Sequence, residues 1–436
     1  MSVLNAEVFH EGIPSELGLF DLPETQVGVQ DIYYVEIRPL SQVTQDSPIE
    51  FNINTSNSAD YLDLKGSQLY LKCQVKKADG TNIGSAEKVG PVNLFLQALF
   101  STTEVTLQDK VTVTCNYNSF TAIIKTLLNF GESSKNTQVT NQLFMLDDYD
   151  HPEDPDPSGG NSGLLERAKP ILGSKTVALQ GPLFHDFFQI PRYLLNQVSV
   201  KVKLYRNSPA FALLSGETSP DYRIDIVDIY LLARKVKVNP AIIYSHNEIL
   251  KSTNAKYFYP KTDTRIQSVP AGATSFHWEN LYQGQKPNKV VVGFVKSVGT
   301  SGNYKTNPFD FQNLNITSAV LSSDGIAVSG SVLKTSFKET SGLDIARAYT
   351  NLFLLNNTWN KDSGNDISKE RFVRGSTLFA FDLDPFFDQF LPLIKTGNIT
   401  LDIQFGTALS DTMACVVMSE FQGYFEINQA RDILFP

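Results

Sequence analysis

The segment "VSVKVKLY" (Val198–Tyr205) decides the fold of this chain, because apolar and polar side chains alternate along it with a period of two residues. Such alternation is typical of a β-strand with one face on a core and the other toward solvent. The segment "NITLDIQF" (Asn398–Phe405) repeats the pattern at an offset of 201 residues (401 − 200). The matched apolar positions are Val200, Val202 and Leu204 in the first segment and Leu401, Ile403 and Phe405 in the second.

The same alternation recurs along the whole chain, and clusters of Gly, Asn, Asp and Pro separate its segments. Many short strands with few helices indicate an all-β protein built from antiparallel sandwiches. The further predicted strands are Ile32–Leu40, Ser67–Lys77, Thr103–Thr114, Arg223–Val238, Asn288–Ser297 and Ser376–Leu383.

Two amphipathic helices interrupt the strands, at an offset of 225 residues (345 − 120). In each, five apolar residues recur at i, i+3, i+4, i+7 and i+8, which predicts a surface helix with one face on a sheet. Gly131 follows the first helix as a predicted C-terminal stop. The stripes are Phe120, Ile123, Ile124, Leu127 and Leu128 in the first helix and Ile345, Ala348, Tyr349, Leu352 and Phe353 in the second.

The shared order of helix, Leu-rich segment and two strands indicates an internal duplication. The Leu-rich segments "PRYLLNQ" (Pro191–Gln197) and "FLPLIKTG" (Phe390–Gly397) are expected to be helical. The offset falls from 225 to 201 and then to 189 (428 − 239), so the first copy carries about 24 and then about 12 extra residues. The loops Asp147–Gly163 and Asn207–Asp221 are the candidates for these insertions.

A length of 436 residues suits two units of about 200 residues each. We predict an arm over residues 1–28, a first sandwich with long surface loops over 29–239 and a second sandwich over 240–436. The boundary falls at Asn239-Pro240, because Pro cannot donate to a strand ladder and disfavours helix in the residue before it. The arm carries the apolar groups "SVL" and "LGLFDL", which suit docking on a neighbouring molecule.

Composition argues for a packed protein, with 42% apolar and 19% charged residues. The formal net charge of −9 and the lack of any cluster of five Lys or Arg give no reason to expect nucleic-acid binding. No apolar run approaches the ~20 residues of a membrane span, and the N-terminus lacks the basic start of a signal peptide. Cys73, Cys115 and Cys415 are far apart in sequence and odd in number, so nothing suggests a disulfide framework or a zinc site, and we interpret Cys73 as a core residue.

A search for chemistry assigns no catalytic, cofactor-binding or metal-binding residue. His277 and Glu279 form an H-x-E pair, but the P-C-x-x-C of zinc deaminases does not follow. A calcium loop starting at Asp362 would need Gly sixth and Glu twelfth, where Ile367 and Val373 stand. No nucleophile elbow, phosphate-binding loop or dinucleotide fingerprint is present.

Two polar segments are therefore interpreted structurally. In "GNDISKERFVRGSTLFAFDLDP" (Gly364–Pro385), Asp366 or Ser368 caps a short helix over Ile367–Arg374, which Gly375 ends. Its polar side chains are expected at a sandwich edge or a subunit contact. The run Asp147–Asp156 holds six carboxylates, and we interpret it as a solvated, self-repelling loop rather than a loose cation site.

Two classes of function remain open on these grounds. One is a structural protein whose function is its assembly surface. The other is a sugar-binding or hydrolytic protein of two sandwiches, which would need a groove lined with Trp and Tyr and a pair of carboxylates. The chain has only Trp278 and Trp359, and neither lies in a run that suggests a sugar platform.

Several segments resemble the major capsid proteins of Polintons (Mavericks) and adintoviruses. Together they run from about residue 15 to the last strand, and their number and order make the set specific although each is weak alone. They are "SELGLFDLPETQ" (Ser15–Gln26), "GPVNLFLQALFSTTEVTLQDK" (Gly90–Lys110), "PRYLLNQVSVKVKL" (Pro191–Leu204), "ENLYQGQKPNKVVVGFV" (Glu279–Val295), "NYKTNPFDFQNLNI" (Asn303–Ile316) and the Gly364–Pro385 segment quoted above.

The resemblance implies a double jelly roll, two eight-stranded sandwiches side by side with a few short surface helices. It further implies a virion protein without enzyme activity or cofactor, whose homotrimers form pseudo-hexagonal, hexon-like capsomers in an icosahedral shell. Its expected partners are other copies of itself, a single jelly-roll penton protein and minor capsid proteins. We expect the long loops of the first half to rise as towers on the outer face and the arm to lie beneath the shell. A host-resident relic of such a capsid gene is the alternative within the family.

Overall fold

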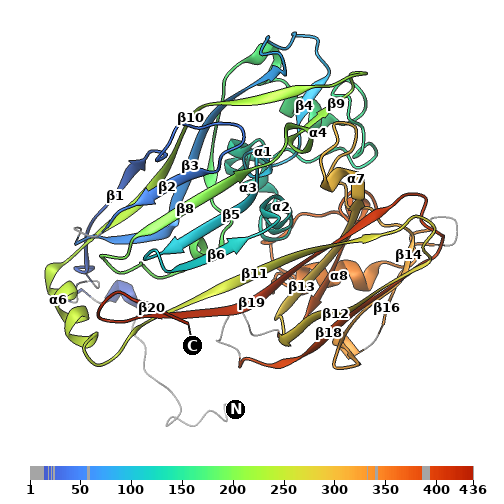
Figure 1. Ribbon diagram of the computed structural model, residues 1–436. Coiled ribbons are helices and arrows are strands. Elements are labelled where there is room, and N and C mark those ends of the chain that lie inside the picture. The colour runs from blue at the N-terminus through green and yellow to red at the C-terminus, as the bar shows by residue number, and fades with distance from the viewer. Residues whose placement is uncertain are drawn as a thin grey trace.

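A computed structural model describes residues 14–17, 19, 20, 22, 25–55, 59–330, 332–338, 342–384 and 393–435. Two β-sandwich lobes lie side by side (Figure 1). The first lobe contains the strands β1 to β10, and the second lobe contains β11 to β20. Every pairing between named strands is antiparallel and stays within one lobe.

The first lobe packs the sheet β1-β10-β3-β7 against the sheet β2-β8-β5-β6. Along the chain the strands alternate between the two sheets except at the β5–β6 hairpin, which is the strand order of a jelly roll. A separate two-stranded sheet pairs β4 with β9. The bounds are β1 Val29–Ile37, β2 Ile49–Ile53, β3 Tyr61–Lys77, β4 Val89–Pro91, β5 Phe100–Leu107, β6 Val111–Cys115, β7 Val177–Pro182, β8 Val200–Arg206, β9 Leu213–Ser215 and β10 Tyr222–Val238.

The second lobe repeats this topology with the sheets β11-β19-β13-β17 and β12-β18-β14-β15. The short strands β15 and β16, which both pair with β14, stand where the first lobe has β6. The bounds are β11 Ala255–Val269, β12 Ser275–Gln285, β13 Lys289–Lys296, β14 Ile316–Ser323, β15 Ile326–Ala327, β16 Leu333–Lys334, β17 Leu378–Asp382, β18 Thr396–Phe405, β19 Met413–Ile427 and β20 Ile433–Leu434.

The fold is therefore a double jelly roll, as expected. The predicted duplication agrees with the strand ends, since β10 ends at Val238 and β19 at Ile427, which preserves the offset of 189 (427 − 238). One predicted strand, Thr103–Thr114, is instead the hairpin β5–β6. Gln108 and Asp109 form its turn with φ of 51° and 54°. This left-handed conformation usually favours Gly, and the turn contains none, so the sequence offered no signal for it.

The Leu-rich segments are not helical where the structure describes them, so that prediction was wrong. Leu194 instead forms an antiparallel bridge with Leu62. Its backbone N–H and C=O are hydrogen-bonded to Leu62 rather than within a helix. In the second lobe, residues 393–395 have no helical turn and residues 396–397 already belong to β18. Residues 390–392 lie outside the described residues.

The α-helices lie in the connections between strands (Figure 1). Three short 3-10 helices, η3 (Gln138–Gln142), η4 (Leu172–Ser174) and η5 (Asp186–Gln189), lie in the first lobe. A fourth, η2 (Ser15–Leu17), precedes β1, and η6 (Val328–Gly330) lies in the second lobe. The α-helices are α1 Phe95–Ala98, α2 Asn118–Asn129, α3 Glu132–Asn136, α4 Ser162–Ala168, α5 Pro209–Ala212, α6 Pro240–Ile249, α7 Ser297–Thr300, α8 Ala346–Leu354 and α9 Lys369–Val373.

The two amphipathic helices differ in burial. Helix α8 buries Ala348 and Leu352 and leaves its other face partly exposed, as a surface helix should. For α2 the surface prediction was wrong, because every residue from Asn118 to Leu128 is buried. Helix α2 lies between the lobes (Figure 1), so the second lobe covers the face that the sequence assigned to solvent.

The apolar cores also cross between the lobes. One cluster joins residues of α2 to the strands of the second lobe, including Phe120 and Val291. The other fills the first sandwich and includes Tyr257 and Phe425 from the second lobe. Because both cores contain residues of both lobes, the two sandwiches are held against each other by core packing as well as by surface contacts.

Candidate assembly surfaces

The segment from Gly364 to Asp384 forms a capped helix followed by a strand. Helix α9 is shorter than predicted, and the Ser368 Oγ caps it by accepting a hydrogen bond from the Arg371 N–H at 3.2 Å. Gly375 follows with φ of +81°, a backbone conformation that favours glycine. Of the two proposed caps, the structure therefore selects Ser368.

The polar side chains of this segment connect the two lobes. Asp366 forms an ion pair with Lys135 of α3, whose side chain is 1% exposed. Arg371 donates from Nη1 to the backbone oxygen of Asp147 at 2.8 Å, and Arg374 pairs with Asp150. The expected edge contact is thus a contact with the other lobe of the same chain. The opposite charges of the two loops were the only sequence signal for it.

The acidic loop lies at the surface, with Asp150 and Glu153 exposed, but the expectation that its charges repel one another was wrong. The Asp147 carboxylate accepts hydrogen bonds from Arg167 at 2.5 Å, from Asn161 at 2.9 Å and from Asn307 of the second lobe at 3.1 Å. Asp156 pairs with Lys88 at 2.6 Å. Each of these carboxylates has a partner of its own, and the loop is held in place rather than extended by charge repulsion.

A buried polar seam joins α2 to the long strands β11 and β19. Lys125 donates from Nζ to the Thr262 Oγ1 at 2.7 Å and lies 3.6 Å from the Glu420 carboxylate. The Thr262 N–H donates to Asp186 of η5 at 3.0 Å. Burial raises the pKa of Asp186 to about 6, against the opposing effect of the Lys125 ammonium.

Two further side chains of α2 complete this contact. The hydroxyls of Thr121 and Thr264 are hydrogen-bonded at 2.7 Å, and Asn356 donates to the Asn129 side chain at 2.9 Å. Thr121, Lys125 and Asn129 are spaced by four residues and form one stripe of α2. We call Thr121, Lys125 and Asn129 the lobe-contact stripe. The sequence shows this stripe only as polar residues on the back of an amphipathic helix.

The H-x-E pair forms a surface ion cluster on strand β12. His277 Nδ1 contacts the Asp402 carboxylate, and Nε2 lies 3.4 Å from the Glu279 carboxylate. The hydrogen bond to Asp402 is the main cause of a raised His277 pKa. Within the described ranges, no group of three or more His, Cys, Asp or Glu side chains has an arrangement that could hold a metal ion.

The three cysteines are buried and unpaired. Burial raises the pKa of the Cys73 and Cys115 thiols to about 12 and that of Cys415 well above its usual value. A thiol with so high a pKa is a poor nucleophile at neutral pH. Cys73 has the core position expected of it.

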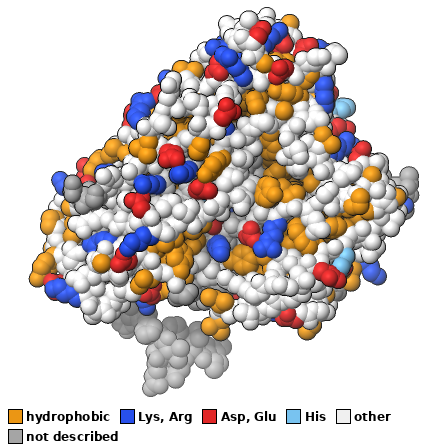
Figure 2. All heavy atoms as spheres, in the orientation of Figure 1, with side chains coloured by type: hydrophobic (Ala, Val, Ile, Leu, Met, Phe, Trp, Pro, Cys, Tyr) orange, Lys and Arg blue, Asp and Glu red, His pale blue; other side chains and the backbone are white. Residues whose placement is uncertain are grey.

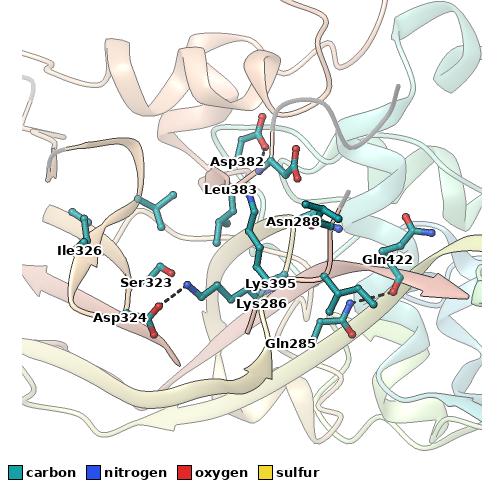
Figure 3. A pocket seen from close by; sticks show the side chains of 16 residues that line it. Gln285, Lys286, Asn288, Ser323, Asp324, Ile326, Asp382, Leu383, Lys395 and Gln422 are labelled. Carbon is teal, nitrogen blue, oxygen red and sulfur yellow. Dashed lines mark hydrogen bonds and ion pairs between the residues drawn. The ribbon is translucent and has the colours of Figure 1, made fainter. Parts of the chain in front are cut away.

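A cavity of about 450 Å³ lies at one end of the second lobe (Figure 3). Lys286 reaches the Asp324 carboxylate across it at 2.5 Å, and Gln285 donates to the backbone oxygen of Gln422 at 3.2 Å. The Lys286 ammonium, Asp324 and the amide are thus already paired with one another or with backbone. Asp382 and Asp384 line the cavity as well, but its described lining contains no Trp, Tyr or His. The aromatic platform of a sugar site and a His base are therefore missing from these residues, and we assign this cavity no chemistry.

The visible face of the molecule carries Lys, Arg, Asp and Glu side chains interspersed over both lobes (Figure 2). A mixture of both signs on that face is typical of a contact or solvent surface and differs from the basic stripe of a nucleic-acid binder. Among the described residues, no helix is long and apolar enough to cross a membrane.

No protein-family model matches the chain. A Caenorhabditis elegans protein described as "Uncharacterized protein F54H12.2" is 22% identical over 430 residues, which cover 94% of this chain and 98% of that protein.

Among solved structures, a chain of the Sputnik virophage matches 99% of this chain with 93% of its own length, at a TM-score of 0.65 and 13% identity. The Faustovirus major capsid protein matches with 96% and 92% coverage, a TM-score of 0.58 and 9% identity. This chain has the double jelly-roll fold of viral major capsid proteins. The mavirus major capsid protein matches the whole chain, at 100% and 97% coverage, a TM-score of 0.53 and 12% identity.

Proposed function

We propose that this chain is the major capsid protein of a Polinton- or adintovirus-type particle. Its homotrimers would form pseudo-hexagonal capsomers that tile an icosahedral shell. The observation that carries the proposal is the duplicated jelly-roll topology, which matches a virophage chain over nearly the full length of both. The motif resemblance spread from residue 15 to the last strand supports the Polinton assignment.

The duplication gives a physical reason for this role. Three copies of two similar sandwiches make six similar lobes, and a tile with six similar sides can pack edge to edge. We take residues 29–239 and 240–436 as the two units and residues 1–28 as an arm beneath the shell. The shared cores make each subunit rigid, which suits a building block.

The proposal extends to partners and location. Contacts within the trimer should bury 2,000 Å² or more, and contacts between trimers should be smaller and more polar. A single jelly-roll penton protein would fill the five-fold vertices, and minor capsid proteins would join the shell. The long first-lobe loops would face outward, and assembly would take place in the host cell. The role requires neither catalysis nor specific nucleic-acid binding.

A host-resident copy of such a capsid gene is the second candidate. The C. elegans protein that matches 94% of this chain favours it, because a similar chain of similar length is encoded by an animal. A host copy that keeps the fold would still form trimers, so particle formation in cells separates the two candidates.

Light scattering after size-exclusion chromatography and negative-stain microscopy of the purified full-length protein test the proposal. We expect trimers near 145 kDa (three times 48.4 kDa) with hexagonal outlines, or closed shells. A monomer that binds oligosaccharide would contradict it and favour the sugar-binding alternative. Deletion of residues 1–25 should leave trimers but prevent shells, and intact shells from that deletion would refute the role of the arm.

A further inference from the structure

In each lobe, one sheet contains both the first and the last long strand, β1 and β10 in the first lobe and β11 and β19 in the second. The outer faces of these two sheets are covered to different degrees. In the second lobe, β13 is buried at seven consecutive residues and β17 at four, so both faces of these two strands are covered, whereas β11 at the edge of the sheet keeps exposed residues. In the first lobe, β3 and β10 alternate between buried and partly exposed residues, so one face is open. At its edge, Tyr34 of β1 is 51% exposed.

The open face is rich in tyrosine and paired charge. Tyr70 and Tyr230 stack with ring centroids 4.5 Å apart, and the Arg38 guanidinium lies 4.8 Å from the Tyr230 ring centroid. Arg38 also pairs with Asp228 of β10 at 2.5 Å. Tyr and Arg are enriched where proteins bind one another, because both cover apolar area while keeping a polar end.

The chain itself shows what covers the equivalent face in the second lobe. Thr121 and Lys125 of the lobe-contact stripe contact β11 and β19, which are the first long strand and the last long strand of the second lobe. Asn129, the third residue of the stripe, contacts Asn356 just after α8. The corresponding strands of the first lobe are β1 and β10, which form the open edge.

The duplication also identifies the matching helix stripe. At the offset of 225, Thr121, Lys125 and Asn129 correspond to Ala346, Thr350 and Leu354 of α8. These three residues line an open groove of about 690 Å³ between α8 and β17, and Leu354 is 44% exposed. In the second lobe, α8 therefore carries a stripe that corresponds to the lobe-contact stripe of α2. In the first lobe, β1 and β10 correspond to the strands β11 and β19 that α2 contacts.

We propose that Ala346, Thr350 and Leu354 of one copy pack on the outer face of β1 and β10 of the next copy. This inference rests on the proposed trimer and names its interface. The contact would be heterologous, joining the second lobe of one subunit to the first lobe of the next. A heterologous contact forms a closed ring when the rotation per subunit closes. Six alternating lobes around one axis close after three copies.

The first test uses full-length single-cysteine additions in the assembled protein. Tyr34→Cys and Leu354→Cys place thiols on the two proposed surfaces, and the three native cysteines are buried and unpaired. Mixing the two variants under oxidation should give a disulfide-linked dimer that neither variant gives alone. The control replaces Leu354→Cys by Val298→Cys, since Val298 on α7 is 55% exposed and outside the proposed contact.

The second test replaces the stripe by a bulky charge. Thr350→Arg should convert trimers into folded monomers, with the thermal unfolding of the monomer unchanged. Val298→Arg is the matched control and should leave trimers intact. Trimers that persist with Thr350→Arg, or equal crosslinking at the Val298 position, would overturn this inference and leave the capsid proposal standing. A wild-type protein that is monomeric under all conditions would overturn the capsid proposal itself.

Discussion

The sheet β11-β19-β13-β17 and the sheet β1-β10-β3-β7 have the same topology, yet β13 and β17 are buried on both faces, whereas β3 and β10 are buried on one. Two helices contribute to this difference, since α8 of the second lobe packs on β17 and α2 of the first lobe contacts β11 and β19 within the same chain. Two lobes with the same topology thus expose different surfaces, because each lobe covers a different part of the other. An open sheet in a single subunit is what a repeating contact between subunits would use.

The largest expected effect contrasts side chains on the two outer faces. Met418 of β19 is 4% exposed near α2, whereas Tyr34 is 51% exposed. Met418→Ala should lower the free energy of unfolding by about 2–5 kcal/mol because it leaves a cavity. Tyr34→Ala should change it by less than about 0.5 kcal/mol in the monomer. Chemical denaturation at a monomeric concentration measures both, and equal losses would show that the two faces are equally covered.

A smaller effect is expected from the two helix stripes. Lys125→Ala should cost about 2–3 kcal/mol, because it removes a charged hydrogen bond to Thr262 and leaves Glu420 without its cation. Thr350→Ala, at the corresponding position of α8, should stay within about 0.5 kcal/mol. The same denaturation assay compares the variants. A Lys125→Ala protein as stable as wild type would mean that the seam contributes little to holding the lobes together.

The smallest expected effect is a pH dependence of the seam. The folded-state pKa of Asp186, raised by burial to about 6, lies above the usual aspartate value of 3.8. The native state therefore holds a proton more tightly than the unfolded state, and this group's contribution to stability is full below about 4 and is lost as the pH rises through 6. Asp186→Asn should raise the free energy of unfolding at pH 8 by up to about 2 kcal/mol and by much less at pH 4.

Denaturation at pH 4, 6 and 8 for both proteins checks this prediction. Burial also raises the pKa of Asp310 to about 6, but Asp310 is present in both proteins and its contribution cancels in their difference. A difference between the two proteins that does not grow with pH would contradict the assignment of the effect to Asp186.

Much of the architecture followed from local pattern. The period-two alternation located β8, β10, β13 and β18, and the constant offsets paired the two copies because homologous strands keep their spacing. The helix stripes were found for the same reason. Local pattern failed at the Leu-rich segment, where Leu194 pairs with Leu62 of a strand far away in sequence. A distant backbone partner leaves no periodic trace in the segment itself.

The contacts between the two lobes were harder to predict from the sequence. The sequence placed the acidic loop in solvent, because six carboxylates within ten residues predict repulsion unless their partners are known. Those partners include Arg167, close in sequence, but also Asn307 and Arg374, which only the fold brings near. For the same reason the interpretation of α2 as a surface helix overlooked the second lobe lying on Thr121 and Lys125.

By itself the sequence determined that this protein is a duplicated β-sandwich with no assembled catalytic or metal-binding motif. Alternation and spacing are local properties, and short-range side-chain and backbone preferences enforce them. Only the tertiary structure decided which faces are covered, because burial depends on which lobe lies against which. That placement leaves β1, β10 and α8 among the exposed surfaces of the described residues, and the proposed capsomer contact rests on them.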